Sequence, residues 1–109
     1  MSAASPGELL ERLSSEVAGA RRLAVIELGR LTERDASSRP LIVRAAIRRL
    51  AQERDEKAAL GLVRLVATHA RSAGLAGEAA AALTAMYDDD STPAVVAVEA
   101  MRAAGALTD

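Results

Sequence analysis

Hydrophobic residues recur every three or four positions along most of the chain, which is the spacing of one face of an α-helix. Short polar or glycine-containing segments interrupt this pattern, and each of the three prolines lies where it resumes. The sequence therefore predicts six helices with short connections. The expected helices cover residues 6 to about 18, about 20–33, 40–54, 56–71, 75–87 and 93–104.

Several of the expected helix ends carry a specific signal. Ser5, followed by Glu8 three residues later, has the pattern of a capping box, in which the serine hydroxyl accepts a bond from the helix backbone. Asp55 can cap the fourth helix in the same way. The acidic segment 88–93 forms the last turn, and Gly105 is expected to stop the last helix.

The starts of these helices are regularly spaced along the chain. Alternate helices begin about 35–37 residues apart, which is the period of stacked two-helix repeats. We therefore expect an all-α fold, a short α-solenoid of about six helices in three stacked αα hairpins. Residues 6–109 would form this single domain, after a disordered N-terminus over residues 1–5.

The two middle helices differ in how much of their surface is apolar. Helix 40–54 has one apolar side and one side that carries Arg44, Arg48 and Arg49. Helix 56–71 is apolar around most of its circumference, apart from a narrow polar strip, and is therefore expected at the buried centre of the stack. Helix 20–33 is expected to bury Leu23, Ala24, Leu28 and Leu31.

The last helix is also apolar on most sides, although the end of a solenoid needs a polar outer face to stay soluble. Two explanations remain open. The helix packs on both the fourth and the fifth helices, or its open side, with Val95, Val96 and Met101, meets a partner or a second copy.

Composition supports helices and excludes several other classes of protein. Alanine and leucine supply 40 of the 55 hydrophobic residues, and Tyr87 is the only aromatic residue, so the chain lacks the residues that strands select. Absent cysteine excludes a disulfide scaffold. The first residues do not resemble a signal peptide, and the longest uncharged run, residues 79–87, is far shorter than a membrane helix of about 20 residues. We expect a cytoplasmic protein that does not enter membranes.

Charge is unevenly distributed although the net charge is −1. Residues 39–71 carry a balance of +5 and residues 72–109 a balance of −5. The arginine-rich middle repeat leaves open a nucleic-acid or phosphate-binding function. Against this alternative, the chain as a whole is not basic and offers no aromatic platform on which bases could stack.

No motif in the sequence points to catalysis, a cofactor or a metal. The acidic run 88–90 lacks the spacing of a calcium loop and is explained by turn formation. His69, a lone histidine, is expected at the boundary of the core. Glu27 lies between apolar positions and is expected at an edge, paired with a neighbouring arginine, with a ligand-facing role as the alternative.

Residues 20–31, with paired arginines, small residues and then Leu28-Gly29, resemble the first helix of a bacterial HEAT-like repeat. Residues 90–101 resemble its Asp-x-Pro-x-Val entry more loosely, and residues 55–65 keep the aspartate without the Leu-Gly. The resemblance covers roughly residues 20–105 and implies an architecture of stacked helices more than a function.

These observations predict a small, non-catalytic HEAT-like protein–protein interaction module, an adapter or subunit of a larger assembly. It would present a rigid surface to an acidic protein partner or, through its last helix, to a second copy. The candidate partner-binding residues are Arg44, Arg48 and Arg49 on one surface and Val95, Val96 and Met101 on the other.

Overall fold

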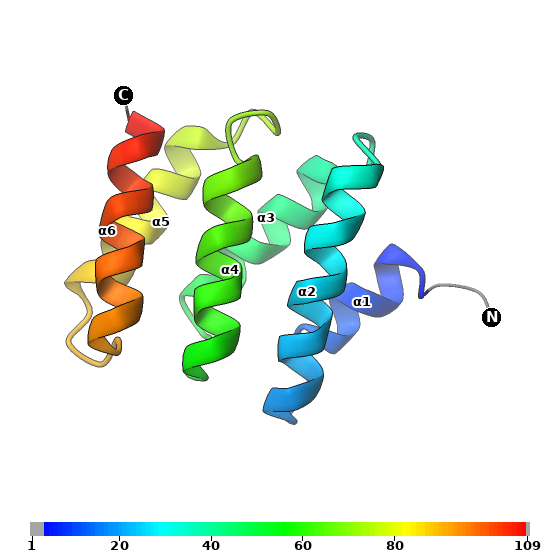
Figure 1. Cartoon of the computed structure of the whole chain (residues 1–109), viewed down its shortest axis with the longest axis horizontal. Coiled ribbons are helices and arrows are strands. Elements are labelled where there is room, and N and C mark those ends of the chain that lie inside the picture. The colour runs from blue at the N-terminus through cyan, green and yellow to red at the C-terminus, as the bar shows by residue number, and fades with distance from the viewer. Residues whose placement is uncertain (1–3, 109) are drawn as a thin grey trace.

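The computed structural model describes residues 4–108, which form six helices and no strand. The helices follow one another through short connections (Figure 1). Their bounds are α1 Pro6–Arg12, α2 Ala18–Arg34, α3 Arg39–Leu50, α4 Glu56–His69, α5 Ala76–Asp88 and α6 Ala94–Thr108.

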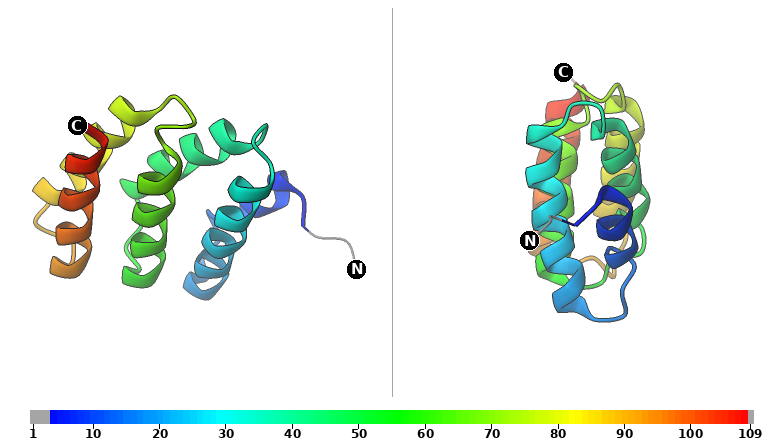
Figure 2. Two further views of the ribbon diagram at one scale, coloured as in Figure 1. Left: turned by 45° about the horizontal axis from the view of Figure 1, so that its top comes forward. Right: turned by 90° about the vertical axis from the view of Figure 1, so that its right-hand side faces the viewer.

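The helices lie in two layers (Figure 2). Helices α2, α4 and α6 stand side by side in one layer, and α1, α3 and α5 cross behind them in the other. Each helix of the back layer packs most extensively on the helix that follows it, so the repeating unit is a helical hairpin. The stack is elongated, with extents of 41 × 29 × 16 Å. The predicted all-α solenoid of three stacked hairpins is confirmed.

Helix α4 lies at the centre of this stack, as its wide apolar surface predicts. It packs against α2, α3, α5 and α6. Leu62, Val63 and Val66 on α4 are almost completely buried. They belong to one continuous core that runs through all six helices, so the hairpins form a single packed unit.

Hydrogen bonds of side chains to the backbone explain which predicted helix ends are correct. Ser5 accepts a bond from the Glu8 backbone N–H at 3.2 Å, and Asp55 accepts one from Ala58 at 2.9 Å, so both predicted N-caps are confirmed. Gly74, with φ of 76°, ends the segment after α4 in the left-handed conformation that glycine adopts without strain.

The first helix is shorter than predicted. It ends at Arg12, and the Ser15 hydroxyl accepts a bond from the Val17 backbone N–H at 3.1 Å, a local bond that competes with helix. Gly19 therefore lies in the first turn of α2 and marks no break.

Two further helix ends differ from the prediction. Helix α3 stops at Leu50, because the Glu53 carboxylate accepts the backbone N–H groups of Arg54 and Asp55 and removes them from any helical ladder. Helix α6 continues through Gly105 to Thr108, since glycine only weakens a helix that tertiary packing supports.

Leu23 was expected in the core but is exposed. Five residues of α-helix turn the chain by about 140°, so Leu23 and the fully buried Leu28 cannot face the same neighbours. The buried positions of α2 are Ala24, Val25, Leu28 and Thr32.

We expected disorder over residues 1–5. Residues 1–3 lie outside the described part of the chain. Ser5 is described and caps α1, so it belongs to the helical domain.

Candidate partner-binding surface

The structure separates the three arginines that the sequence assigns to one binding surface. Arg44 and Arg48 are exposed on α3, in the back layer. Arg44 lies 3.9 Å from the Glu78 carboxylate of α5, and both side chains are mostly exposed, so this ion pair is weak. Arg49 turns inward, with a side chain only 17% exposed. The arginine surface therefore consists of two residues.

Arg49 is part of an ion cluster around Glu53, whose side chain is fully buried. The Glu53 carboxylate accepts bonds from Arg21 Nε at 2.9 Å and from Arg49 Nε at 3.4 Å. Burial raises the pKa of Glu53, but the bond from Arg21, the backbone N–H of Asp55 and the charges of Arg21 and Arg49 together outweigh it and lower this pKa. The cluster joins α2 to the end of α3. In it, the negative charge of the buried Glu53 carboxylate is compensated by two arginines and by backbone N–H groups.

A second pair of side chains joins the same two repeats. The Asp55 carboxylate accepts a bond from Arg22 Nε at 2.7 Å while it caps α4. The bond from Arg22 and the N-cap bond hold the pKa of Asp55 well below its ordinary value. Sequence reasoning missed both contacts because about 32 residues separate the partners. The only sequence signal was the predominance of arginine over lysine, 13 residues to one.

Other arginines bind the ends of helices. Arg39 donates to the Thr32 carbonyl near the end of α2 at 2.8 Å, and Arg71 donates to the Ala106 carbonyl of α6 at 2.9 Å. Lys57 and Arg64 are exposed on α4, in the layer opposite the one that carries Arg44 and Arg48. The cations behind the +5 balance of residues 39–71 therefore lie on two faces of the molecule, and several of them are engaged in structural hydrogen bonds.

On α6, the predicted surface residues divide between core and solvent. Val96 is completely buried and cannot meet a partner, which corrects its assignment. Val95 and Met101 are exposed, and Val98, one helical turn before Met101, is exposed as well. The packing of α6 on α4 and α5 is confirmed, and α6 still leaves apolar side chains in solvent. Contact of this open side with a partner or a second copy stays a prediction.

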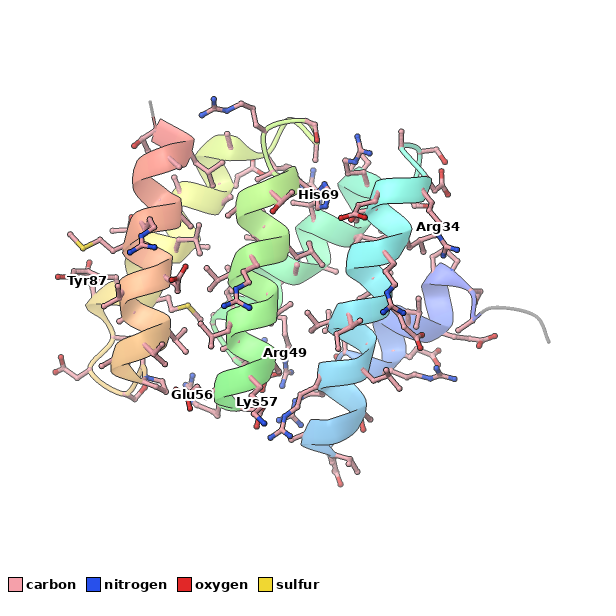
Figure 3. All side chains as sticks on the ribbon, in the orientation of Figure 1. Arg34, Arg49, Glu56, Lys57, His69 and Tyr87 are labelled. Atoms are coloured by element: carbon pink, nitrogen blue, oxygen red, sulfur yellow. The ribbon has the colours of Figure 1, made fainter. Side chains whose placement is uncertain are left out.

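Part of this apolar surface forms a groove between α5 and α6 at the C-terminal end of the stack, which we name the C-terminal groove. Tyr87 projects from this end of the molecule, on the side of α6 away from α4 (Figure 3). The groove has a volume of about 340 Å³. Its lining consists of Thr84, Tyr87, Asp88, Met101, Ala104, Gly105 and Thr108.

The opposite end of the stack carries charged residues. A depression of about 640 Å³ between α1 and α2 has Arg34 at its edge, at the other end of the array from Tyr87. Glu27 is half-buried there, at the edge position predicted for it, but its carboxylate forms no ion pair with an arginine in the described part of the chain. The lining is Ala4, Glu8, Leu9, Arg12, Glu27, Arg30, Glu33 and Arg34.

A smaller groove of about 280 Å³ lies between α2 and α4 on the front layer. His69 lines it at the boundary of the core, as predicted, and burial together with nearby Arg39 lowers the pKa of His69. Gly61 also lines it, and allows α2 to approach α4 closely: a Cβ at this position would lie 2.7 Å from Val25 Cγ1.

The acidic run at residues 88–90 forms the turn between α5 and α6. Asp89 accepts bonds from the Ser91 backbone N–H at 2.9 Å and hydroxyl at 2.7 Å, and these bonds lower its pKa. Within residues 4–108, no three histidine, cysteine or carboxylate side chains gather as metal ligands would. Nor does any helix in that range have the length and apolarity to cross a membrane.

The candidate surfaces are thus the apolar C-terminal groove, the charged depression at the other end, the groove between α2 and α4, and the two exposed arginines of α3. Comparison of the chain with protein-family models, with curated proteins and with solved structures finds no match in any of the three.

Proposed function

We propose that this chain is a non-catalytic protein-interaction module of the HEAT-like kind, which serves as an adapter or subunit in a cytoplasmic assembly and binds its partner through the C-terminal groove. One observation carries the proposal: the two ends of the stack differ in chemistry. The N-terminal depression is lined by six charged side chains among eight residues, whereas the C-terminal groove has one, Asp88, among seven.

This difference has a direct physical meaning. A stack of hairpins must end in surfaces that water can solvate, and the charged end meets that requirement. The other end leaves Val98 55% exposed, Met101 56% exposed and Tyr87 44% exposed. Covering half-exposed side chains of this size contributes about 1 kcal/mol each, enough in combination to favour a partner.

The arginine surface is the second candidate. Arg48 is exposed and Arg44 makes only a weak ion pair, so both could meet an acidic partner. Leu41 is the one large exposed apolar side chain on α3, against Val98, Met101 and Tyr87 at the C-terminal end. Two cations with a single apolar neighbour supply orientation and association rate more than affinity. We therefore rank this surface below the C-terminal groove.

Site-specific photo-cross-linking distinguishes the two surfaces. A photoreactive amino acid is placed at Val98 in one variant and at Arg48 in another, both exposed and outside the core. We expect a discrete cross-linked protein from the Val98 position, and the same product to disappear when Gly105→Leu fills the groove. Cross-linking at Arg48 alone, lost in an Arg44→Glu/Arg48→Glu variant, would transfer the function to the arginine surface. No product at either position would remove the proposal.

A further inference from the structure

We propose that the occupant of the C-terminal groove is an amphipathic helix of another protein, with an apolar stripe flanked by lysine or arginine. This inference rests on the proposed function and specifies the partner's chemistry. Its basis is the combination of an apolar groove between two helices with acidic residues around it.

The groove suits a helix because of its small lining residues and its position. Ala104 and Gly105 are the small residues of the lining, and a Cβ at Gly105 would meet nothing within 4 Å, so a partner's backbone can approach closely. Tyr87 and Met101 are the large side chains of the lining. A helix laid in this groove would extend the stack in the direction in which α6 already follows α4.

The charges around the groove favour a partner of positive charge. Asp88 lines the groove, and Asp89 and Asp90 follow it in the turn. Residues 72–109 contain a single cation, Arg102, which lies 3.7 Å from the Glu99 carboxylate. From outside this segment, Arg54 acts on Asp89, whereas Asp88 and Asp90 form no ion pair within residues 4–108. Lysine or arginine beside the apolar stripe of a partner therefore meets a net negative charge, which favours encounter and discriminates against acidic helices.

The same charges disfavour a second copy of this chain. A two-fold contact through the groove would bring together two C-terminal repeats, each with a balance of −5. A head-to-tail contact would press the charged N-terminal depression against an apolar groove, which leaves charged groups desolvated without partners.

Three synthetic helical peptides of equal length and identical leucine stripe test the proposal, with lysine, glutamine or glutamate on the flanks. Binding to the full chain is followed by titration calorimetry at low salt, and the site by backbone amide NMR shifts. We expect the lysine peptide to bind about tenfold tighter than the glutamine peptide, and the glutamate peptide more weakly still. The shifts should centre on Thr84, Gly105 and Thr108.

Two variants make the result specific to the groove. Gly105→Leu places a side chain in open space, so the fold stays intact while the groove is filled, and affinity for the lysine peptide should fall at least about tenfold. Asp88→Asn/Asp90→Asn should remove most of the preference for lysine over glutamine. Leu41→Ser, on another helix and as exposed as Met101 at 56%, is the control and should leave binding unchanged.

The outcomes separate the two proposals. Equal binding of all three peptides at the groove would overturn the basic partner and retain the interaction surface. Absence of groove-centred shifts with every peptide would overturn both. A dimer in sedimentation equilibrium that Gly105→Leu converts to a monomer would replace the foreign helix with a second copy.

Discussion

At the scale of single residues, two glycines show that the effect of a substitution in a helix depends on how close the neighbouring helix lies. Gly29 of α2 and Gly61 of α4 both lie inside helices and line the same groove. A Cβ at Gly29 would meet nothing within 4 Å, whereas one at Gly61 would collide with the buried Val25. The same substitution is therefore expected to have opposite effects at the two positions.

Gly29→Ala should raise the free energy of unfolding by about 0.5–1 kcal/mol, because alanine loses less backbone freedom than glycine on folding. Gly61→Ala should lower it by about 1 kcal/mol or more, since overpacking against a stiff β-branched side chain exceeds that gain. Urea denaturation of both variants measures the difference. Equal stabilisation by the two changes would show that α2 and α4 are not in close contact.

The Glu53 and Asp55 carboxylates make stability depend on pH. Both have a lower pKa in the folded chain than in the unfolded one, so their stabilisation is complete above the ordinary carboxyl pKa of about 4. It is lost as the pH falls below that value toward the folded pKa, because the unfolded chain then binds more protons. We expect the melting temperature to fall steeply below about pH 4.5.

Glu53→Gln tests the cause of this acid sensitivity. It should lower stability at pH 7 by about 2–3 kcal/mol, because Arg21 and Arg49 lose their buried counter-charge. It should also make the decline in acid shallower, measured by thermal melts at several pH values. Glu33→Gln, at an exposed position, is the control, and an unchanged acid profile in Glu53→Gln would exclude the cluster as its source.

At the scale of elements, the predicted caps at Ser5 and Asp55 are correct because a capping side chain and the backbone N–H that donates to it lie within one turn of helix. The predicted ends of α3 and α6 are wrong for a different reason. Glu53 binds the backbone after α3, and packing carries α6 through Gly105. Both effects depend on contacts that local sequence does not contain.

The central position of α4 has a matched test in two adjacent residues. Val63 is 1% exposed and Arg64 is exposed on the same helix. Val63→Asp should unfold the protein, because a buried carboxylate without a partner costs several kcal/mol and total stability is about 5–15 kcal/mol. Arg64→Asp should leave the fold intact. Circular dichroism distinguishes them, and a wild-type melting temperature for Val63→Asp would place α4 outside the core.

At the scale of the whole molecule, the charge balance of residues 39–71 does not form one continuous cationic surface. Arg44 and Arg48 face out from the back layer, and Lys57 and Arg64 from the front layer. Phosphate contacts add to affinity when the cations face the same nucleic-acid molecule together, so this division weakens the nucleic-acid alternative.

Filter binding with duplex DNA at low salt tests that alternative. We expect retention no stronger than that of an Arg44→Glu/Arg48→Glu variant, which has the same fold and lacks one of the two cationic faces. Tight, strongly salt-dependent retention of the wild type that the variant loses would establish nucleic-acid binding through α3.

The amino-acid sequence by itself determined the helical class, the six helices, their regular spacing and two of their caps. All of these depend on residues within one helical turn of each other or on a repeated hydrophobic spacing, and both are visible in the amino-acid sequence. Only the tertiary structure decided which side chains of α6 are open, since Val96 is buried and Val98 exposed by packing on α4 and α5. It also decided that Arg49 binds Glu53, and that the two ends of the stack differ in polarity, because these properties arise between residues that the chain separates by whole repeats.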